Sequence, residues 1–388
     1  LKLALLLHDI GKPRGSEHTE RGATMIPLIA RQLSLPEPDG KLVMFLVENH
    51  LAMADLSQRR DFNEEGVLKG FAAKVGNLNQ LQMLYLMTYA DIKSVGRGAW
   101  AVWKDSLLWE LYEKTAALLS KAPRAEEAAE TDFRHALLSI LPKSIAREEA
   151  ERHCDRVPPR YAVEVTPEEA VAHLRLIQRL KDEPMTVSFS FTDAYAEMWL
   201  CTGDMPARFS QIAGTFVGNG VNVISAQAFT RKDGIILDRF RLSDAGGKVV
   251  TDTEFWEKVK NDLSDVLQGR KAVADMVKAR QRRIAFRKVV PQPGVTRIHI
   301  DNKSSPEYTI LDLTTWDRIG LLYAVTNCLS ESGLDIHFSK ISTRLNLAVD
   351  VFYVTDKTTR AKVEEPSRLA EVTKALTEIG EKFGVTAT

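Results

Sequence analysis

The sequence has few cysteines, no long apolar run and no excess of charge of either sign. Its three cysteines, Cys154, Cys201 and Cys328, are far apart and form no C-x-x-C pair, so they indicate neither a zinc knuckle nor a disulfide scaffold. Such cysteine usage is typical of a reducing, cytoplasmic compartment. The apolar run nearest the start, residues 3–7, is far shorter than the roughly 20 residues of a membrane span. We therefore expect a cytoplasmic protein with no membrane partner.

Acidic and basic residues are balanced, with 52 of each kind in 388 residues. A protein that binds nucleic acid mainly through electrostatics would show a basic excess, so we expect no nucleic-acid partner. At roughly 150 residues per domain, this length predicts two or three domains. Because the chain begins with Leu1 inside a helical pattern, we also expect that a further segment precedes it.

The first part of the chain, residues 1–143, shows helical periodicity. Leu42, Phe45 and Asn49, for example, recur at helical spacing, and no alternating strand pattern occurs there. Residues 144–183 are charged and mostly helical as well. We therefore expect an all-α bundle followed by a helical connector.

From residue 184 the pattern becomes strand-like, and an order of strand, helix, strand, strand, helix occurs twice. A shift of 113 positions (317 − 204) superposes the two runs once one residue is dropped in the hairpin. The matching pairs are Asp204 and Asp317, Gly220 and Gly333, Thr230 and Thr343, and Asp238 and Asp350. Two copies, at 184–290 and 291–388, predict a pair of small α+β modules packed together.

Five side chains that can ligate a metal lie in the helical first part. His8 and Asp9 end an apolar helix, and their side chains point about 100° apart, so both can reach one cation at the rim of a bundle. His18, His50 and Asp91 follow on other helical segments. Imidazole and carboxylate ligands together suit zinc, iron, manganese or magnesium. Each histidine alone is more often a surface residue, so the prediction rests on all five occurring in one region.

The order of these residues resembles the HD superfamily of metal-dependent phosphohydrolases. The surrounding strings are similar to the HD domain of the bacterial bifunctional P-II uridylyltransferase/uridylyl-removing enzymes: His8-Asp9-Ile10-Gly11-Lys12, Glu17-His18-Thr19-Glu20-Arg21-Gly22, Val47-Glu48-Asn49-His50-Leu51 and Ala90-Asp91-Ile92-Lys93-Ser94-Val95-Gly96. The resemblance implies that this chain is the C-terminal part of such an enzyme, with an HD-type bundle at 1–143. It also implies a nucleotidyltransferase domain and one further histidine ligand upstream.

The same resemblance implies a reaction and roles for the residues. The reaction is hydrolysis of the uridylyl–tyrosine phosphodiester on the P-II signalling protein, with release of UMP. His8, Asp9 and Asp91 would ligate a divalent metal, with Mg²⁺ or Mn²⁺ expected first. His18 and His50 would bind a second metal or the phosphate. Lys12, one helical turn after His8, would neutralise charge on the phosphoryl group. An equally weighted alternative is that Lys12 is a solvated lysine at a helix end.

In each repeat, the turn between the first strand and the first helix has the chemistry of a carboxylate site. Backbone N–H groups point outward at a helix N-terminus, and a glycine such as Gly320 lets a ligand approach the backbone. Asp204 and Asp317 either accept from an amino group or cap the helix. The second strands open around Asn222 and Asp335, where the backbone can contact the other side of a ligand.

These turns, Gly203-Asp204-Met205-Pro206-Ala207-Arg208-Phe209 and Trp316-Asp317-Arg318-Ile319-Gly320-Leu321-Leu322, resemble the ACT domain. That family is a ferredoxin-like βαββαβ module that often binds amino acids. The resemblance implies glutamine as the effector and pairing of the modules by their sheet edges, with ligands at the interface. A homo-oligomer through the ACT domains is a further expectation. Ala207 replaces the family's glycine, which makes the first copy the weaker candidate.

Together these features predict an all-α HD-type bundle followed by two ACT domains. The function predicted is glutamine-regulated removal of UMP from uridylylated P-II. Two alternatives stay open: another HD–ACT phosphohydrolase, such as a guanosine tetraphosphate hydrolase, and a non-catalytic amino-acid-sensing module. The guanosine tetraphosphate hydrolases usually carry a Glu-Asp pair after the His-Asp motif, whereas Ile10-Gly11-Lys12-Pro13 follows it here.

Overall fold

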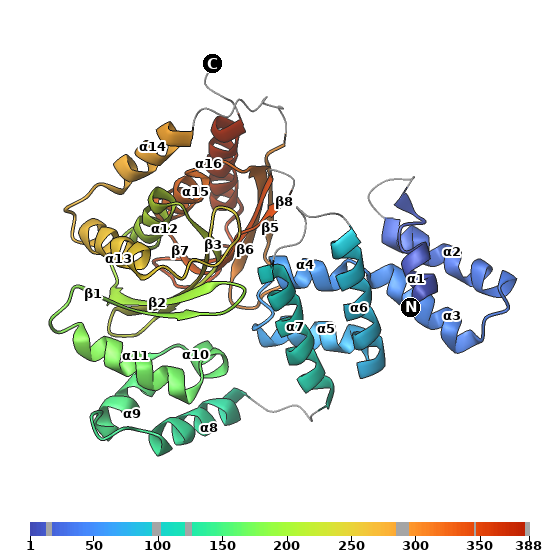
Figure 1. The fold of residues 1–388 in the computed structure, drawn as a ribbon, viewed down its shortest axis with the longest axis horizontal. Helices are drawn as coiled ribbons and strands as arrows, with labels where there is room; N and C mark the ends of the chain where they lie inside the picture. Colours follow the sequence, from blue (N-terminus) through green and yellow to red (C-terminus); the bar gives the residue numbers. More distant parts are fainter. Residues whose placement is uncertain (13–17, 95–101, 121–125, 285–294, 345–346, 385–388) are drawn as a thin grey trace. The chain divides into compact units, whose positions relative to one another are not determined.

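The computed structural model describes residues 1–12, 18–94, 102–120, 126–284, 295–344 and 347–384. It divides into two compact units, residues 1–123 and residues 124–388, coloured blue to teal and green to red in Figure 1. Across the described ranges, no helix is both long enough and apolar enough to cross a membrane.

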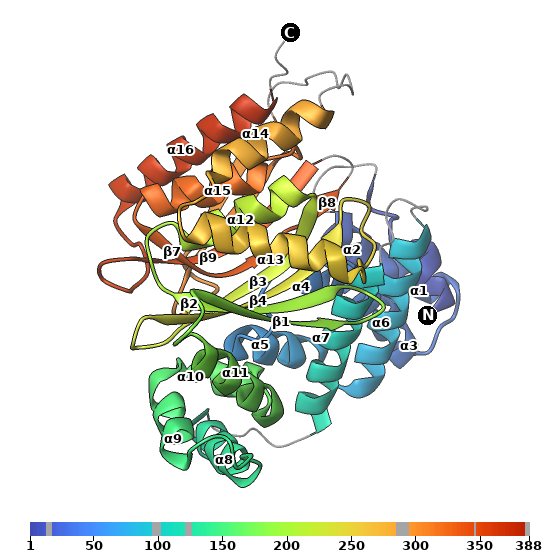
Figure 2. The ribbon, with the colours of Figure 1, turned by 60° about the vertical axis from the view of Figure 1, so that its left-hand side comes forward.

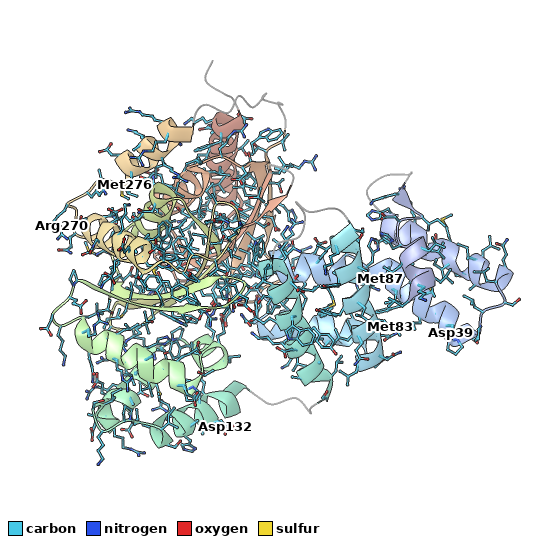
Figure 3. The ribbon with its side chains drawn as sticks, in the orientation of Figure 1. Asp39, Met83, Met87, Asp132, Arg270 and Met276 are labelled. Atoms are coloured by element: carbon cyan, nitrogen blue, oxygen red, sulfur yellow. The ribbon has the colours of Figure 1, made fainter. Side chains whose placement is uncertain are left out.

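All regular elements described in the first unit are helices, as its periodicity predicts. Its helices are α1 (Lys2–Leu7), α2 (His18–Gln32), α3 (Glu37–Asn49), α4 (Ala52–Arg59), α5 (Glu65–Val75), α6 (Leu78–Ser94) and α7 (Val102–Ser120). Leu46 of α3, Leu84 and Met87 of α6 and Leu108 of α7 are fully buried in one core. Figure 3 labels Met87 within this unit. This core fixes the positions of the helix ends that carry the candidate ligands.

The second unit begins with four helices: α8 (Glu126–Ser139), α9 (Arg147–Arg156), α10 (Pro159–Glu164) and α11 (Pro167–Arg179). Phe133 and Leu137 of α8 share a core with Tyr161 of α10 and with Trp199 and Phe229 of the sheet. The first compact unit therefore ends at Pro123 rather than at the expected residue 143, because the apolar face of α8 packs with the connector helices.

A single antiparallel sheet runs through the second unit. Its strands are β1 (Met185–Phe191), β2 (Ala196–Gly203), β3 (Val221–Thr230), β4 (Ile235–Asp244), β5 (Arg297–Asp301), β6 (Thr309–Trp316), β7 (Leu334–Lys340), β8 (Thr343–Arg344) and β9 (Leu347–Asp356). The strand order is β1-β2-β4-β3-β7-β9-β6-β5, and β8 pairs with β9. The two repeats are joined where β3 pairs with β7, with Ser225 opposite Lys340 and Gln227 opposite Phe338.

The remaining helices, α12 (Arg208–Asn219), α13 (Thr253–Leu267), α14 (Val273–Ile284), α15 (Leu321–Glu331) and α16 (Pro366–Gly384), lie on the face opposite α10 and α11 (Figure 2). Phe216 and Leu263 pack on Phe240 of the first half. Leu329 packs in the corresponding core of the second half. The result is a layer of helices, a sheet, and a second layer of helices beneath the first half.

The order of elements within each half differs from the βαββαβ order that the ACT resemblance implies. The described elements run ββαββαα in the first half and ββαβββα in the second. In both halves the edge position beside the first core strand is occupied by the strand that precedes it in the chain. β1 pairs with β2 in the first half, and β5 pairs with β6 in the second. The segment after α13 forms helix α14 instead of a strand. The expected boundary at residues 290 and 291 lies outside the described residues.

A buried polar chain connects the helical layer to the β3–β4 hairpin. Arg231 Nη1 donates to His153 Nδ1 at 2.8 Å, so His153 donates from Nε2 to the Tyr161 hydroxyl at 3.1 Å. The Tyr161 hydroxyl in turn donates to His173 Nδ1 at 2.6 Å. Burial lowers the pKa of His153 and of His173 to about 3, with nearby Arg231 adding to the shift at His153. Both rings are therefore neutral at pH 7 and the chain of donors is complete.

Replacing the buried tyrosine tests this network. We expect Tyr161→Phe to lower the free energy of unfolding by about 1–3 kcal/mol, because it leaves ring nitrogens of two buried histidines without their partner. Urea denaturation measures the change. Tyr323→Phe is the matched control, since no hydrogen bond of the Tyr323 hydroxyl occurs within the described residues, and it should change stability by less than about 0.5 kcal/mol.

Candidate metal centre and ligand clefts

The first unit places the five predicted ligands at helix ends and on one helix. His8 directly follows α1, with Asp9 next to it, and His18 is the first residue of α2. His50 directly follows α3, and Asp91 lies in the last turns of α6. Residues from four separate segments are thus brought together.

Asp9 lies at the centre of this cluster. His8 Nε2 lies 3.3 Å from Asp9 Oδ2 and 3.3 Å from Asp91 Oδ1. On the other side, Asp9 Oδ1 lies 3.7 Å from Nε2 of His18 and 3.9 Å from Nε2 of His50. One ligand atom from each of Asp9, His18 and His50 lies within 4.8 Å of the other two. Three imidazole nitrogens and two carboxylates therefore face one small volume.

The backbone orients the histidine rings toward this volume. His8 Nδ1 donates to the Leu5 carbonyl at 2.7 Å, and His50 Nδ1 donates to the Val47 carbonyl at 2.8 Å. Each bond fixes the tautomer and leaves the Nε2 lone pair for a ligand. His18 Nε2 is buried without a hydrogen-bond partner among the described residues. A buried nitrogen in that state is costly, and a cation or a ligand's donor would satisfy it. The residues therefore fit a metal.

The charges around the cluster also suit a cation. Burial lowers the pKa of His50, and nearby His8 lowers it further, against the opposing effects of the Val47 carbonyl and the two aspartates. Burial raises the pKa of Asp9, but the bond from Lys12 and the charges of His8 and His50 outweigh that effect and lower it. Neutral imidazole and ionised carboxylate are the forms that bind metals.

Lys12 is the one predicted site residue of this unit whose side chain is mostly exposed, at 63%. Its Nζ lies 2.5 Å from Asp9 Oδ2. Lys12 is therefore ion-paired at the rim of the cluster, where it can also face an anion held there. Glu17, Val95 and Gly96 of the motif strings lie outside the described residues.

Gly11 holds the His8–Lys12 turn against the start of α2. A Cβ at Gly11 would lie 2.1 Å from the His18 carbonyl oxygen and 2.8 Å from the Gly22 nitrogen. Contacts shorter than 3 Å would force the two segments apart. Only glycine therefore allows His8 and Asp9 to approach His18 so closely.

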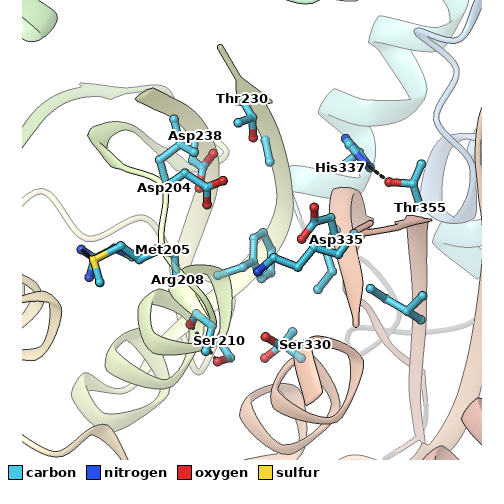
Figure 4. Close-up of a pocket in the computed structure, with 18 of the residues that line it drawn as sticks. Asp204, Met205, Arg208, Ser210, Thr230, Asp238, Ser330, Asp335, His337 and Thr355 are labelled. Atoms are coloured by element: carbon cyan, nitrogen blue, oxygen red, sulfur yellow. Dashed lines mark hydrogen bonds between the residues drawn. The ribbon is translucent and has the colours of Figure 1, made fainter. Parts of the chain in front are cut away.

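Two clefts of the second unit are lined by residues of both repeats. The first cleft, a cavity of about 180 Å³, is lined by Asp204 and Arg208 of the first copy and by Asp335 of the second. Figure 4 shows Asp204 on one side and Asp335 across from it. The second cleft, of about 210 Å³, joins Asp317 and Gly320 to Asn222. Pockets for drug-sized molecules have volumes of roughly 300 Å³ or more, and both clefts are smaller than that. Each cleft is therefore of a size to hold a small metabolite.

The turns at these clefts share a left-handed residue before the helix. Ala207 has φ 62° and Gly320 has φ 96°, and each occupies the N-cap position of its helix. Neither helix receives a side-chain cap, so Asp204 and Asp317 are not the helix caps that one interpretation of the sequence expects. Ala207 adopts the conformation of the family's glycine in spite of its Cβ, and the first cleft forms as the second does.

The clefts also contain residues that the sequence interpretation did not assign to a site. Asp238 lines the first cleft together with Lys357 and Arg360, and Asp350 lines the second. Burial raises the pKa of Asp335, and Asp204 raises it further, while Lys357 and Arg360 oppose the shift. The repeat alignment did match Asp238 with Asp350, and an aspartate kept at the same place within a strand of both copies was the available signal.

Known proteins and one family model are similar to this chain. A family model for the ACR9-like, ACT-like domain matches residues 297–383. A bifunctional uridylyltransferase/uridylyl-removing enzyme of Bradyrhizobium diazoefficiens is 31% identical over 97% of this chain, which spans 41% of that relative. The enzyme of the same name from Azospirillum brasilense is 32% identical over 97% of this chain, again 41% of the relative. The crystal structure of an unknown protein from Galdieria sulphuraria covers 52% of this chain and 95% of its own, at 17% identity and a TM-score of 0.16, too low to bear on the fold.

Substitution of Gly11 tests the geometry of the cluster. We expect Gly11→Ala to weaken binding of Mn²⁺ by about 10- to 100-fold, because the added methyl group displaces His18 from Asp9. Titration calorimetry measures the affinity. Gly70→Ala, in α5, is the control, because its added methyl meets nothing within 4 Å. Equal affinities of the two variants would contradict the close approach.

Exchange of the left-handed residues tests the strain at the two turns. We expect Ala207→Gly to raise the free energy of unfolding by about 0.5–1 kcal/mol, since glycine removes the left-handed penalty. Gly320→Ala should lower it by about 1–3 kcal/mol, because its Cβ would be strained and would lie 2.6 Å from Gln281 Nε2. Urea denaturation measures both, and a destabilising Ala207→Gly would contradict the strain.

Proposed function

We propose that this chain, which is related over nearly its whole length to the bifunctional uridylyltransferase/uridylyl-removing enzymes, removes UMP from uridylylated P-II protein under the control of glutamine. The observation that carries the catalytic part is the convergence of His8, Asp9 and Asp91, with His18 and His50, on one volume. The chain spans 41% of the relative from Bradyrhizobium diazoefficiens, so the uridylyltransferase activity in the relatives' name is not part of this proposal.

In this proposal His8, Asp9 and Asp91 hold a divalent cation, Mg²⁺ or Mn²⁺. When bound, such a cation lowers the pKa of a coordinated water and polarises phosphoryl oxygens. His18 and His50 contact the phosphate or a second cation through Nε2, the atom that the structure turns toward Asp9. The backbone bonds at His8 and His50 keep both rings oriented while the substrate is bound.

Lys12 has a separate part in the proposed reaction. Its ammonium group lies at the exposed rim, where the phosphodiester of a protein substrate would enter. From this position Lys12 would neutralise charge that develops on the phosphoryl oxygens. Gly11 supports these steps by letting the His8–Lys12 turn approach α2.

The second unit supplies the sensing part of the proposal. Each cleft is formed by the turn of one copy and the second strand of the other, so a bound amino acid would contact both ACT-like copies. The family match at 297–383 supports this assignment. Glutamine regulates hydrolysis only if it binds one arrangement of the protein more tightly than another.

A pair of aspartate variants tests the hydrolytic proposal. We expect the wild-type chain to bind Mn²⁺ and to release UMP from uridylylated P-II, and Asp91→Asn to lower the rate by at least about 100-fold, because it removes a charged ligand. Liquid chromatography measures the UMP released. Asp39→Asn is the matched control, since Asp39 is exposed on α3 in the same unit (Figure 3) and should keep the wild-type rate.

Two other outcomes would contradict the proposal in different ways. Bound Mn²⁺ without release of UMP would favour another phosphohydrolase, and hydrolysis of guanosine tetraphosphate by the same sample would identify it. Absence of both metal binding and hydrolysis would favour a non-catalytic amino-acid-sensing module.

A further inference from the structure

The two clefts contain corresponding residues of the two copies of the repeat, but the hydrogen bonds of their aspartates differ. In the second cleft, Asp350 accepts from the Ser342 nitrogen at 3.3 Å, and Asp317 accepts from the Thr343 hydroxyl at 2.6 Å. In the first cleft, Asp238 Oδ1 is buried and has no hydrogen-bond partner in the described part of the chain. Within the described residues, the first cleft therefore contains a buried carboxyl oxygen without a donor, whereas the corresponding Asp350 of the second cleft accepts a hydrogen bond.

Leaving the buried carboxyl group of Asp238 without a hydrogen-bond donor costs free energy. Its side chain is 2% exposed, and it lies on β4 at the wall of the cavity. Figure 4 shows its carboxyl group close to that of Asp204. Burial raises the pKa of Asp238 to about 8, and the neighbouring Asp204 adds to the shift. Burial and Asp317 likewise raise the pKa of Asp350, so the two clefts differ in hydrogen bonding and not in the direction of this shift. A buried acceptor without a donor costs free energy, and a pair of carboxyls costs more when both ionise.

A ligand with a positive charge and several N–H donors would remove both costs. A primary ammonium group has three donors and no acceptor, and it can bridge two carboxylates. The same cavity is also lined by Lys357 and Arg360, which belong to the second copy. An α-amino acid carries both an ammonium group for the carboxyls and a carboxylate for these cations.

We propose that the first cleft binds the ammonium group of an α-amino acid between Asp238 and Asp204, and that the second cleft does not bind an amino acid in this way. The inference deepens the proposed sensing function and rests on it. It reverses the order expected from the turns, in which Ala207 made the first copy the weaker candidate. The feature that decides binding is the carboxyl group on β4 that lacks a donor, and not the glycine of the turn.

The experiment compares two isosteric variants with two ligands. L-Glutamine is the first ligand, and 4-carbamoylbutanoic acid, which is glutamine without its α-amino group, is the second. We expect wild-type protein to bind glutamine at least about 10- to 100-fold more tightly than the analogue in titration calorimetry, the range that charged hydrogen bonds supply. Asp238→Asn should lose this preference, and the matched control Asp350→Asn should keep it.

The outcomes separate this inference from the sensing function. If neither glutamine nor any of the other common amino acids binds the wild-type chain, the sensing proposal itself is wrong. If glutamine binds but Asp350→Asn loses the preference for the amino group while Asp238→Asn retains it, sensing stands and the assignment of the cleft is wrong. Should Asp238→Asn fail to fold by circular dichroism, Asp204→Asn at the exposed side of the same cleft replaces it, with the same loss of preference expected.

Discussion

The pairing of β3 with β7 is the interaction on which the two clefts of the second unit depend. Backbone hydrogen bonds between these two strands turn two small sheets into one and bring the copies side by side in a fixed register. Because the second strand of one copy then lies next to the first turn of the other, Asp335 faces Asp204 and Asn222 lies beside Gly320. Without this pairing each turn would face solvent, and neither cleft would have its second wall.

The candidate metal centre depends on a different constraint, the close approach of short helices. α1 ends at Leu7, directly before His8, and α2 begins at His18, so these ligands lie at helix ends where the backbone has free carbonyls and amides. Those carbonyls, of Leu5 and Val47, are the ones that orient the rings of His8 and His50. The same local geometry that ends each helix therefore also prepares the ligand nitrogens.

Much of this architecture could be predicted from the sequence, because its signals are local. Helical periodicity indicated the helices of the first unit, and the repeat indicated two similar halves, although β5 and the separate helix α14 were not predicted. The strand at Met185–Phe191 was visible from its alternation, but its place at the sheet edge was not, since the same alternation suits either edge. The bond that the Glu169 amide donates to the Thr166 hydroxyl oxygen was foreseeable, because a threonine before proline and two acids is a typical helix start.

What could not be predicted depends on long-range contacts. The packing of α8 with the connector helices follows from Phe133 and Leu137, whose partner Tyr161 lies beyond the next helix. The motif strings did indicate the residues that meet around Asp9, but the distances require the packed core. Asp238 was matched to Asp350 in the repeat, yet the difference in their bonding comes from Ser342, a neighbour that no alignment of the copies reveals.

Because both copies belong to one polypeptide, the walls of each cleft are covalently tied to each other. Modules that assemble from separate chains come apart on dilution, and their ligand sites disappear with the assembly. Here the effective concentration of one wall near the other is set by the connection between the copies. Occupancy of the clefts would then follow the level of the small molecule and not the abundance of the protein that detects it.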